Sequence, residues 1–150
     1  MAGTNYWSPK SGNIRCHMKI LELMKVHTIV SSPDATIAEV VDLFDLYQLS
    51  VLYVVDSRGV PIGSISEKSI SELVCDNLLG QNRVITAGEI MRWPNNVVDE
   101  HSEVEEALRL FRDDEVENIG VTSVGRLIGT VRRIDICQAI LAGDLVLQSQ

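Results

Sequence analysis

Apolar residues at positions i, i+3, i+4 and i+7 form one face of an amphipathic helix, and two stretches of the chain have this spacing. The first set is Ile37, Val40, Val41 and Phe44, and the second is Val104, Ala107, Leu108 and Phe111. A capping-box pair stands before each set, Thr36 with Glu39 and Ser102 with Glu105. Thr36 stands one residue before the first apolar position of its helix, whereas Ser102 stands two residues before. The pattern therefore predicts two helices and leaves their first residues open.

Each of these helices is followed by two short apolar runs that a turn separates, which is typical of a β-hairpin. The expected strands are 51–55 and 62–65 in the first half of the chain, and 119–121 and 127–131 in the second. The turns are Asp56-Ser57-Arg58-Gly59 and Ser123-Val124-Gly125. A second helix then closes each half, with apolar positions at Ile70, Leu73, Val74 and Leu78, or at Ile136, Ala139 and Ile140.

The two halves of the chain are copies of one unit. A shift of 67 residues superposes Val54 on Val121, and after the loss of one residue in the turn a shift of 66 superposes Gly63 on Gly129. We therefore expect an α/β (α+β) fold, in which two tandem β-α-β-β-α units pack as a pseudo-two-fold pair. The expected division is a flexible leader over 1–13, a first unit over 14–80, and a second unit with a C-terminal tail over 81–150.

Composition limits the partners and the compartment. The chain has 150 residues, of which 45% are hydrophobic, and a net charge of −8, so it has enough apolar residues for a core and a surface that disfavours nucleic acid and anionic membranes. No apolar run reaches the length of a membrane span, and the N-terminus lacks a signal-peptide pattern. The three cysteines are odd in number and far apart, which favours a reducing compartment. We therefore expect a cytoplasmic protein.

Four features resemble cystathionine-β-synthase (CBS) domains. They are a methionine-containing lead-in, the segment Ser32-Pro33-Asp34-Ala35-Thr36 before a helix, the strand Val54-Val55-Asp56, and the glycine-containing strands that close on a helix. The resemblance covers about residues 17–142. The resemblance implies a tandem CBS pair, or Bateman module, that forms a homodimer and regulates a partner protein without being an enzyme. It also implies an adenosine-containing ligand between the paired sheets, such as AMP, ADP or ATP and sometimes S-adenosylmethionine or NAD. No cofactor is required, and Mg²⁺ would accompany the phosphates.

The resemblance further implies a Thr/Ser-x-x-Asp motif where a strand meets a helix. There the hydroxyl caps the helix, the helix N-terminus favours phosphate, and the carboxylate binds the ribose. The second copy has Asp135 but carries Arg132 at the hydroxyl position, whereas the first copy has Ser66 but carries Ser69 at the carboxylate position. One site that uses Asp135 is therefore expected, with Arg132 and Arg133 as phosphate ligands. For Asp135, Arg132 and Arg133 the alternative is an ordinary charged residue at a helix start. For Ser66 the alternative is a plain N-cap.

By position in the family, eight strand residues are candidates to surround the adenine. They are Val30, Leu52, Tyr53 and Ile65 in the first copy, and Val97, Ile119, Gly120 and Val131 in the second. Each also suits a hydrophobic core, because alternate residues of a strand face inward. Tyr53 stands where the family often has proline and would fill space, so the two clefts are expected to differ.

Two functions remain open on the sequence alone. The first is a sensor that binds an adenine nucleotide and changes the arrangement of its two units. The second is a ligand-free homodimeric scaffold, for which Leu43, Leu46 and Leu110 would supply helical contact surface. The sequence has no P-loop, no G-x-G-x-x-G after a strand and no HExxH, so we expect no catalytic residue and no metal site.

Overall fold

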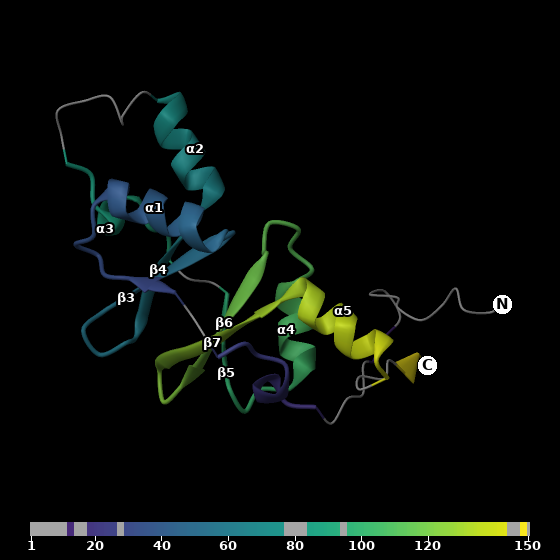
Figure 1. Ribbon diagram of the computed structural model, residues 1–150. Coiled ribbons are helices and arrows are strands. Elements are labelled where there is room, and N and C mark those ends of the chain that lie inside the picture. Colours follow the sequence, from purple (N-terminus) through teal and green to yellow (C-terminus); the bar gives the residue numbers. More distant parts are fainter. Residues whose placement is uncertain are drawn as a thin grey trace.

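Two three-stranded sheets of the same topology lie side by side, each flanked by its own helices (Figure 1). The computed structural model describes residues 12–13, 18–26, 29–76, 84–93, 96–143 and 148–149. Within them the β-α-β-β-α order occurs twice. This confirms the expected fold class.

The first unit begins with the strand β2 (Val30–Ser31), which leads into the helix α1 (Ile37–Tyr47). The strands β3 (Val51–Val55) and β4 (Pro61–Ser66) follow as an antiparallel hairpin, and the helix α2 (Glu67–Cys75) comes last. The strand β2 pairs in parallel with the other side of β3, so the strand order is β2-β3-β4. The expected strand 51–55 is confirmed at both ends. Proline suits the first position of β4 because it has no N–H to donate.

The second unit repeats this layout. The strand β5 (Val97–Asp99) leads into the helix α4 (Val104–Leu110), and β5 is parallel to the strand β6 (Asn118–Ser123). The strand β7 (Arg126–Arg132) returns antiparallel to β6 and continues directly into the helix α5 (Arg133–Leu141).

The helix starts keep the register of the repeat. Thr36 caps α1, and its hydroxyl accepts a hydrogen bond from the Glu39 backbone N–H at 3.3 Å, as expected. The expected cap of α4 at Ser102 is wrong, because the capping position is Glu103 and its side chain makes no capping bond. A shift of 67 residues places Thr36 on Glu103. The apparent offset between the two capping boxes therefore arose from a chance Ser-x-x-Glu pattern.

The two hairpin turns differ in length. In the first, the Asp56 carboxylate accepts backbone hydrogen bonds from Val60 at 3.0 Å and from Arg58 at 2.8 Å, and these bonds lower the pKa of Asp56. The second turn is shorter, and Val124 and Gly125 both have a positive φ, of 50° and 80°. Positive φ at both central residues matches the twist of a two-residue hairpin. This shorter turn accounts for the change of the repeat shift from 67 to 66.

Each hydrophobic core contains residues from the lead-in segment of the other copy. The short 3-10 helix η2 (Ile20–Glu22) buries Ile20 in the second unit, and α3 (Ala87–Ile90) buries Ala87 in the first. Figure 1 shows α3 beside α1, and the purple turn of η2 beside the second sheet. The other buried members of the first core are Val40, Phe44, Leu52, Val54 and Ile65. Those of the second are Leu23, Val98, Val104, Ala107, Leu108, Phe111, Val116, Ile119, Val121, Val131, Ile136 and Ala139.

Backbone hydrogen bonds hold these exchanged segments in place. Lys25 and Thr130 bond to each other through both backbone groups, at 2.8 and 3.1 Å, and Arg92 and Ser64 do the same, at 2.9 and 2.7 Å. The repeat shifts of 67 and 66 residues relate one pair to the other, so the two contacts are pseudo-two-fold equivalents. The sequence division at 80 and 81 follows the repeat, whereas each core draws residues from both sides of it.

Tyr53 and Gly120, which the repeat shift of 67 relates, meet where the two units touch. The Tyr53 side chain is 2% exposed, and a Cβ atom at Gly120 would lie 3.2 Å from two atoms of its ring. The single phenol O–H is shared between the backbone carbonyls of Asn96 and Asn118, each 3.3 Å from the phenol oxygen, and burial raises the pKa of Tyr53. The ring of Tyr53 therefore packs into the space that the missing side chain of Gly120 leaves.

Two very short strands lie near the chain ends. The strand β1 (Gly12–Asn13) pairs antiparallel with β8 (Gln148–Ser149). The rest of the expected leader, 1–11, lies outside the described residues. Among the helices in the described ranges, none has the length and apolar character needed to cross a bilayer.

Candidate ligand-binding cleft

A cleft of about 500 Å³ opens between the two units. The first unit contributes Ser50, Val51, Ser64, Ser66, Glu67 and Lys68 to its walls. The segment that joins the units contributes Arg92, Trp93 and Asn96, and the second unit contributes Asp113, Glu115, Val116 and Glu117. Small-molecule sites have volumes of roughly 300–1,000 Å³, so the cleft has room for a nucleoside-sized ligand.

Strand alternation decides which side chains of β3 and β4 face this cleft. Val51 pairs with Ser66, and both line the cleft, whereas their neighbours Leu52 and Ile65 pair with each other and are fully buried in the core. Successive residues of a strand point to opposite faces of the sheet. The polar Ser66 thus stands at the edge of the cleft where β4 becomes α2.

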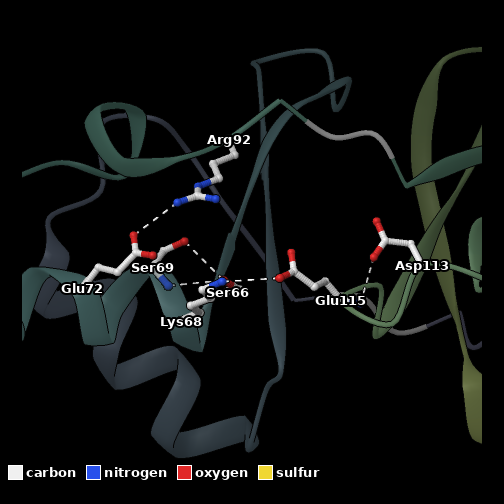
Figure 2. A network of polar contacts seen from close by, with 7 residues as sticks. All are labelled: Ser66, Lys68, Ser69, Glu72, Arg92, Asp113 and Glu115. Atoms are coloured by element: carbon white, nitrogen blue, oxygen red, sulfur yellow. Dashed lines mark hydrogen bonds and ion pairs between the residues drawn. The ribbon is translucent and has the colours of Figure 1, made fainter.

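The junction of β4 and α2 is held by a pair of serines. The Ser66 hydroxyl accepts a hydrogen bond from the Ser69 backbone N–H at 3.3 Å, and the two hydroxyl oxygens lie 3.2 Å apart (Figure 2). Ser69 is buried, and it does not line the cleft. Ser66 therefore acts as an N-cap and also lines the cleft. The first N–H groups of α2, at Glu67 and Lys68, have no partner within the helix.

Charged side chains reach across the cleft. The Lys68 ammonium, on α2, lies 3.4 Å from a carboxylate oxygen of Glu115 in the second unit (Figure 2). Arg92 pairs with Glu72 of α2 at 3.2 Å. All four side chains are about half or more exposed, so each pair contributes little to stability. The carboxylates of Glu67, Asp113 and Glu117 also line the cleft.

At the equivalent junction of the second unit, the Asp135 carboxylate bonds to Arg132, the residue that precedes α5. The carboxylate accepts three hydrogen bonds from Arg132: from the backbone N–H at 2.8 Å, from Nε at 3.3 Å and from Nη2 at 2.8 Å. These bonds raise the pKa of the Arg132 guanidinium. The Asp135 side chain is 3% exposed, and neither residue lines the cleft described above.

Arg133 contacts the segment that forms the far wall of the cleft. It donates to the backbone carbonyls of Val116 at 2.9 Å and of Asp113 at 2.7 Å. Its guanidinium carbon also lies 5.1 Å from the centre of the Phe111 ring, in cation–π geometry. Arg133 therefore holds residues that line the cleft without lining it itself.

The CBS domain family model matches residues 20–76 and 87–142, which together make up most of the chain. The chain belongs to the CBS domain family. The two matched segments coincide with the two units, so the expected resemblance to a CBS pair is confirmed.

Relatives with known structures share the fold of the pair. The chain is similar to CBSX2 from Arabidopsis thaliana, solved in complex with AMP, at 21% identity and a TM-score of 0.72, over 84% of this chain and 98% of that one. The CBS pair of MJ0100, solved with 5′-methylthioadenosine and S-adenosylmethionine, matches at 18% identity and a TM-score of 0.70, over 82% and 99%. An uncharacterised protein of Methanopyrus kandleri, MK0525, is 30% identical over 118 residues. These residues are 78% of this chain and 60% of that protein, so the chain spans less than two thirds of this relative.

The adenine-lining candidates divide between the cores and the surface between the CBS units. Leu52, Ile65, Ile119 and Val131 are fully buried in the two cores. Tyr53 and Gly120 contact each other, as described above, and their strand partners are Val30 and Val97. None of the eight lines the cleft. For the four core residues, the core alternative is the one that the structure has.

Several cleft residues were not among the sequence candidates. Lys68 follows a strand end by two residues, and its charge gave no signal of a cleft. Asp113 and Glu115 belong to an acidic run between a helix and a strand, which is the one feature that could have marked them. Their distance of almost 50 residues from Ser66 in the chain hides the fact that they face it.

Asp135→Ala is expected to destabilise the chain without any ligand, by about 1–3 kcal/mol, because it removes a buried acceptor of three hydrogen bonds. Urea unfolding measures this loss. Asp34→Ala removes an exposed carboxylate elsewhere and should change the free energy of unfolding by no more than about 0.5 kcal/mol. Equal effects of the two substitutions would contradict a structural role for Asp135.

Proposed function

We propose that this CBS pair is a regulatory module that binds an adenosine-containing ligand in the cleft between its units and passes the binding signal to a partner protein. The observation that supports this most is the position of the cleft, because both units and the segment that joins them contribute to its walls. A ligand there contacts both units at once. Its binding energy can therefore favour one relative arrangement of the units over another.

The cleft offers each kind of contact that an adenosine needs. Val51 and Trp93 supply apolar surface for the base, and Trp93 is 73% exposed, which leaves its ring accessible. Glutamate and aspartate oxygens on the wall of the second unit can accept hydrogen bonds from the ribose hydroxyls. They would take the place of the carboxylate that the first copy lacks at Ser69.

Relatives with the same fold support this class of ligand. The similar CBSX2 was solved with AMP, and MJ0100 with 5′-methylthioadenosine and S-adenosylmethionine. AMP, ADP and ATP were the ligands expected from the sequence. In this cleft their phosphates would depend on Lys68, Arg92 and the N-terminus of α2. The proposal assigns no catalytic residue.

The test is a thermal-shift panel of adenosine, 5′-methylthioadenosine, S-adenosylmethionine and AMP on the wild-type chain and on Ser64→Phe. A ligand at 100 times its Kd stabilises a protein by roughly 2.7 kcal/mol, which for a chain of this size raises Tm by roughly 5–10 °C. Ser64 lines the cleft, so a phenyl ring there should fill it and abolish the shift, while its backbone bonds to Arg92 remain.

Ser57→Phe is the matched control, because Ser57 lies in an exposed turn away from the cleft and its variant should keep the full shift. If no compound shifts Tm in the wild type, ligand sensing is excluded for this panel. A shift that survives in Ser64→Phe would place the ligand elsewhere.

A second candidate function, a homodimeric scaffold, rests on the surface formed by α1 and α2 of the first unit. A groove of about 410 Å³ there includes Val41, Phe44 and Ile70 in its lining, and Leu46 on α1 is 71% exposed. Of the other two leucines expected at a dimer surface, Leu43 and Leu110 pack partly buried against the cores. A molar mass of one chain by light scattering would exclude this candidate.

A further inference from the structure

The charges on the walls of the cleft are unfavourable for an anion. Four carboxylates and two cations line it, namely Glu67, Asp113, Glu115 and Glu117 against Lys68 and Arg92. Carboxylates near a bound phosphate repel it, and less solvent in a cleft strengthens the repulsion.

Both cations already have carboxylate partners. Lys68 lies 3.4 Å from Glu115, and Arg92 lies 3.2 Å from Glu72. A phosphate that recruited Lys68 would have to displace Glu115 and would then lie beside its freed carboxylate (Figure 2). The gain of one ion pair is therefore offset by the loss of another and by a new repulsion.

The helix start at the cleft is also unfavourable for an anion. The first residue of α2 is Glu67, whose negative charge already complements the positive end of the helix dipole. The repeat shift of 66 places Arg133 at the first position of α5. The two copies thus begin their last helices with opposite charges, and the cleft lies at the acidic one.

No preformed metal site in the described residues offsets this negative charge. Among the described residues, no three aspartate, glutamate, histidine or cysteine side chains converge as ligands for a metal ion. The described residues therefore provide no multidentate Mg²⁺ site that would neutralise a phosphate in the cleft.

We propose that the cleft selects adenosine derivatives whose 5′ substituent is uncharged or cationic, and that it discriminates against 5′-phosphates. This inference rests on the proposed function, because it specifies the ligand class of the same cleft. An uncharged thioether or a sulfonium group at the 5′ position would meet the carboxylates without repulsion, and a sulfonium would be attracted to them.

Isothermal titration of the wild-type chain with adenosine, 5′-methylthioadenosine and AMP, each with and without Mg²⁺, tests this selectivity. The ratio of the AMP Kd to the adenosine Kd should be at least about ten, because several carboxylates act on one phosphate. Mg²⁺ should leave this ratio unchanged. The ratio is the appropriate measure, since both ligands have the same base and ribose.

Glu115→Gln combined with Glu117→Gln removes two carboxylates from the wall, and it should lower the ratio about threefold or more. Asp114→Asn is the matched control, because Asp114 is an exposed neighbour in the same segment and does not line the cleft. Its ratio should equal that of the wild type.

The outcomes separate the two proposals. Binding of none of the three compounds would refute the proposed function itself. AMP that binds as tightly as adenosine, with or without Mg²⁺, would overturn the selectivity and leave adenosine binding intact. An unchanged ratio in the double variant, or an equal decrease in Asp114→Asn, would also overturn it, because cleft carboxylates would then not be the cause.

Discussion

Tyr53→Ala is expected to lower the free energy of unfolding by about 3–5 kcal/mol, the usual effect of removing a buried aromatic ring. The Tyr53 side chain is 2% exposed and packs on Gly120 at the contact between the two units. Gly120 itself has no side chain that could fill the space left by the ring. The variant should therefore weaken the packing between the two units.

Urea unfolding of Tyr53→Ala and Tyr53→Phe separates the ring from its hydroxyl. Tyr53→Phe keeps the packing and loses the long hydrogen bond that the phenol shares between two backbone carbonyls, so it should lower the free energy of unfolding by about 1 kcal/mol. Equal losses in the two variants would show that ring packing contributes nothing.

Gly120→Ala extends this test to the other side of the contact. In the wild type, the added methyl would lie 3.2 Å from the Tyr53 ring, which is closer than ordinary van der Waals contact. In a Tyr53→Ala background the clash with the ring disappears, and only the contact with the flexible Leu127 side chain, at 3.0 Å, remains. The two substitutions should therefore be non-additive, with a coupling free energy of about 0.5–3 kcal/mol, as residues in contact show.

Gly129→Ala is expected to lower the free energy of unfolding by about 3 kcal/mol, and Tm by roughly 6–12 °C for a chain of this size. A Cβ atom at Gly129 would lie 2.5 Å from the backbone carbonyl oxygen of Lys25. That carbonyl accepts the Thr130 N–H at 3.1 Å, so the two segments cannot separate without losing the hydrogen bonds between them. A backbone atom cannot turn aside as a flexible side chain can.

Thr130→Ala is the matched control for this clash. It changes the next residue of the same strand and leaves both backbone bonds to Lys25 in place, so its effect should stay within about 1 kcal/mol. If Thr130→Ala destabilises the chain as much as Gly129→Ala does, close backbone approach at Gly129 is not the cause.

Much of the fold followed from local pattern. The helix α1 begins at the residue after its predicted cap, and β3 has the predicted bounds, because helix period, capping chemistry and turn residues all act over a few neighbouring positions. The repeat then indicated the second unit. Where the local pattern was ambiguous, as at Ser102, the prediction failed, since Ser-x-x-Glu also occurs by chance beside a helix.

The sequence left the two faces of each strand undecided. An apolar residue such as Leu52 suits a core and a ligand cleft equally well, and the structure buries it in the core while Val51 and Ser66 line the cleft. A period of two separates the faces but does not say which one the helices cover. That choice depends on packing against distant segments.

Local periodicity and the spacing of the two copies were enough to predict the duplicated unit, its element types and the family. The exchange of lead-in segments between the cores, and the position of Glu115 opposite Lys68 across a cleft, became clear only from the folded structure. These contacts join residues that are close in space but far apart in the chain. Their partners are set by how the two units pack, and no local pattern encodes that arrangement.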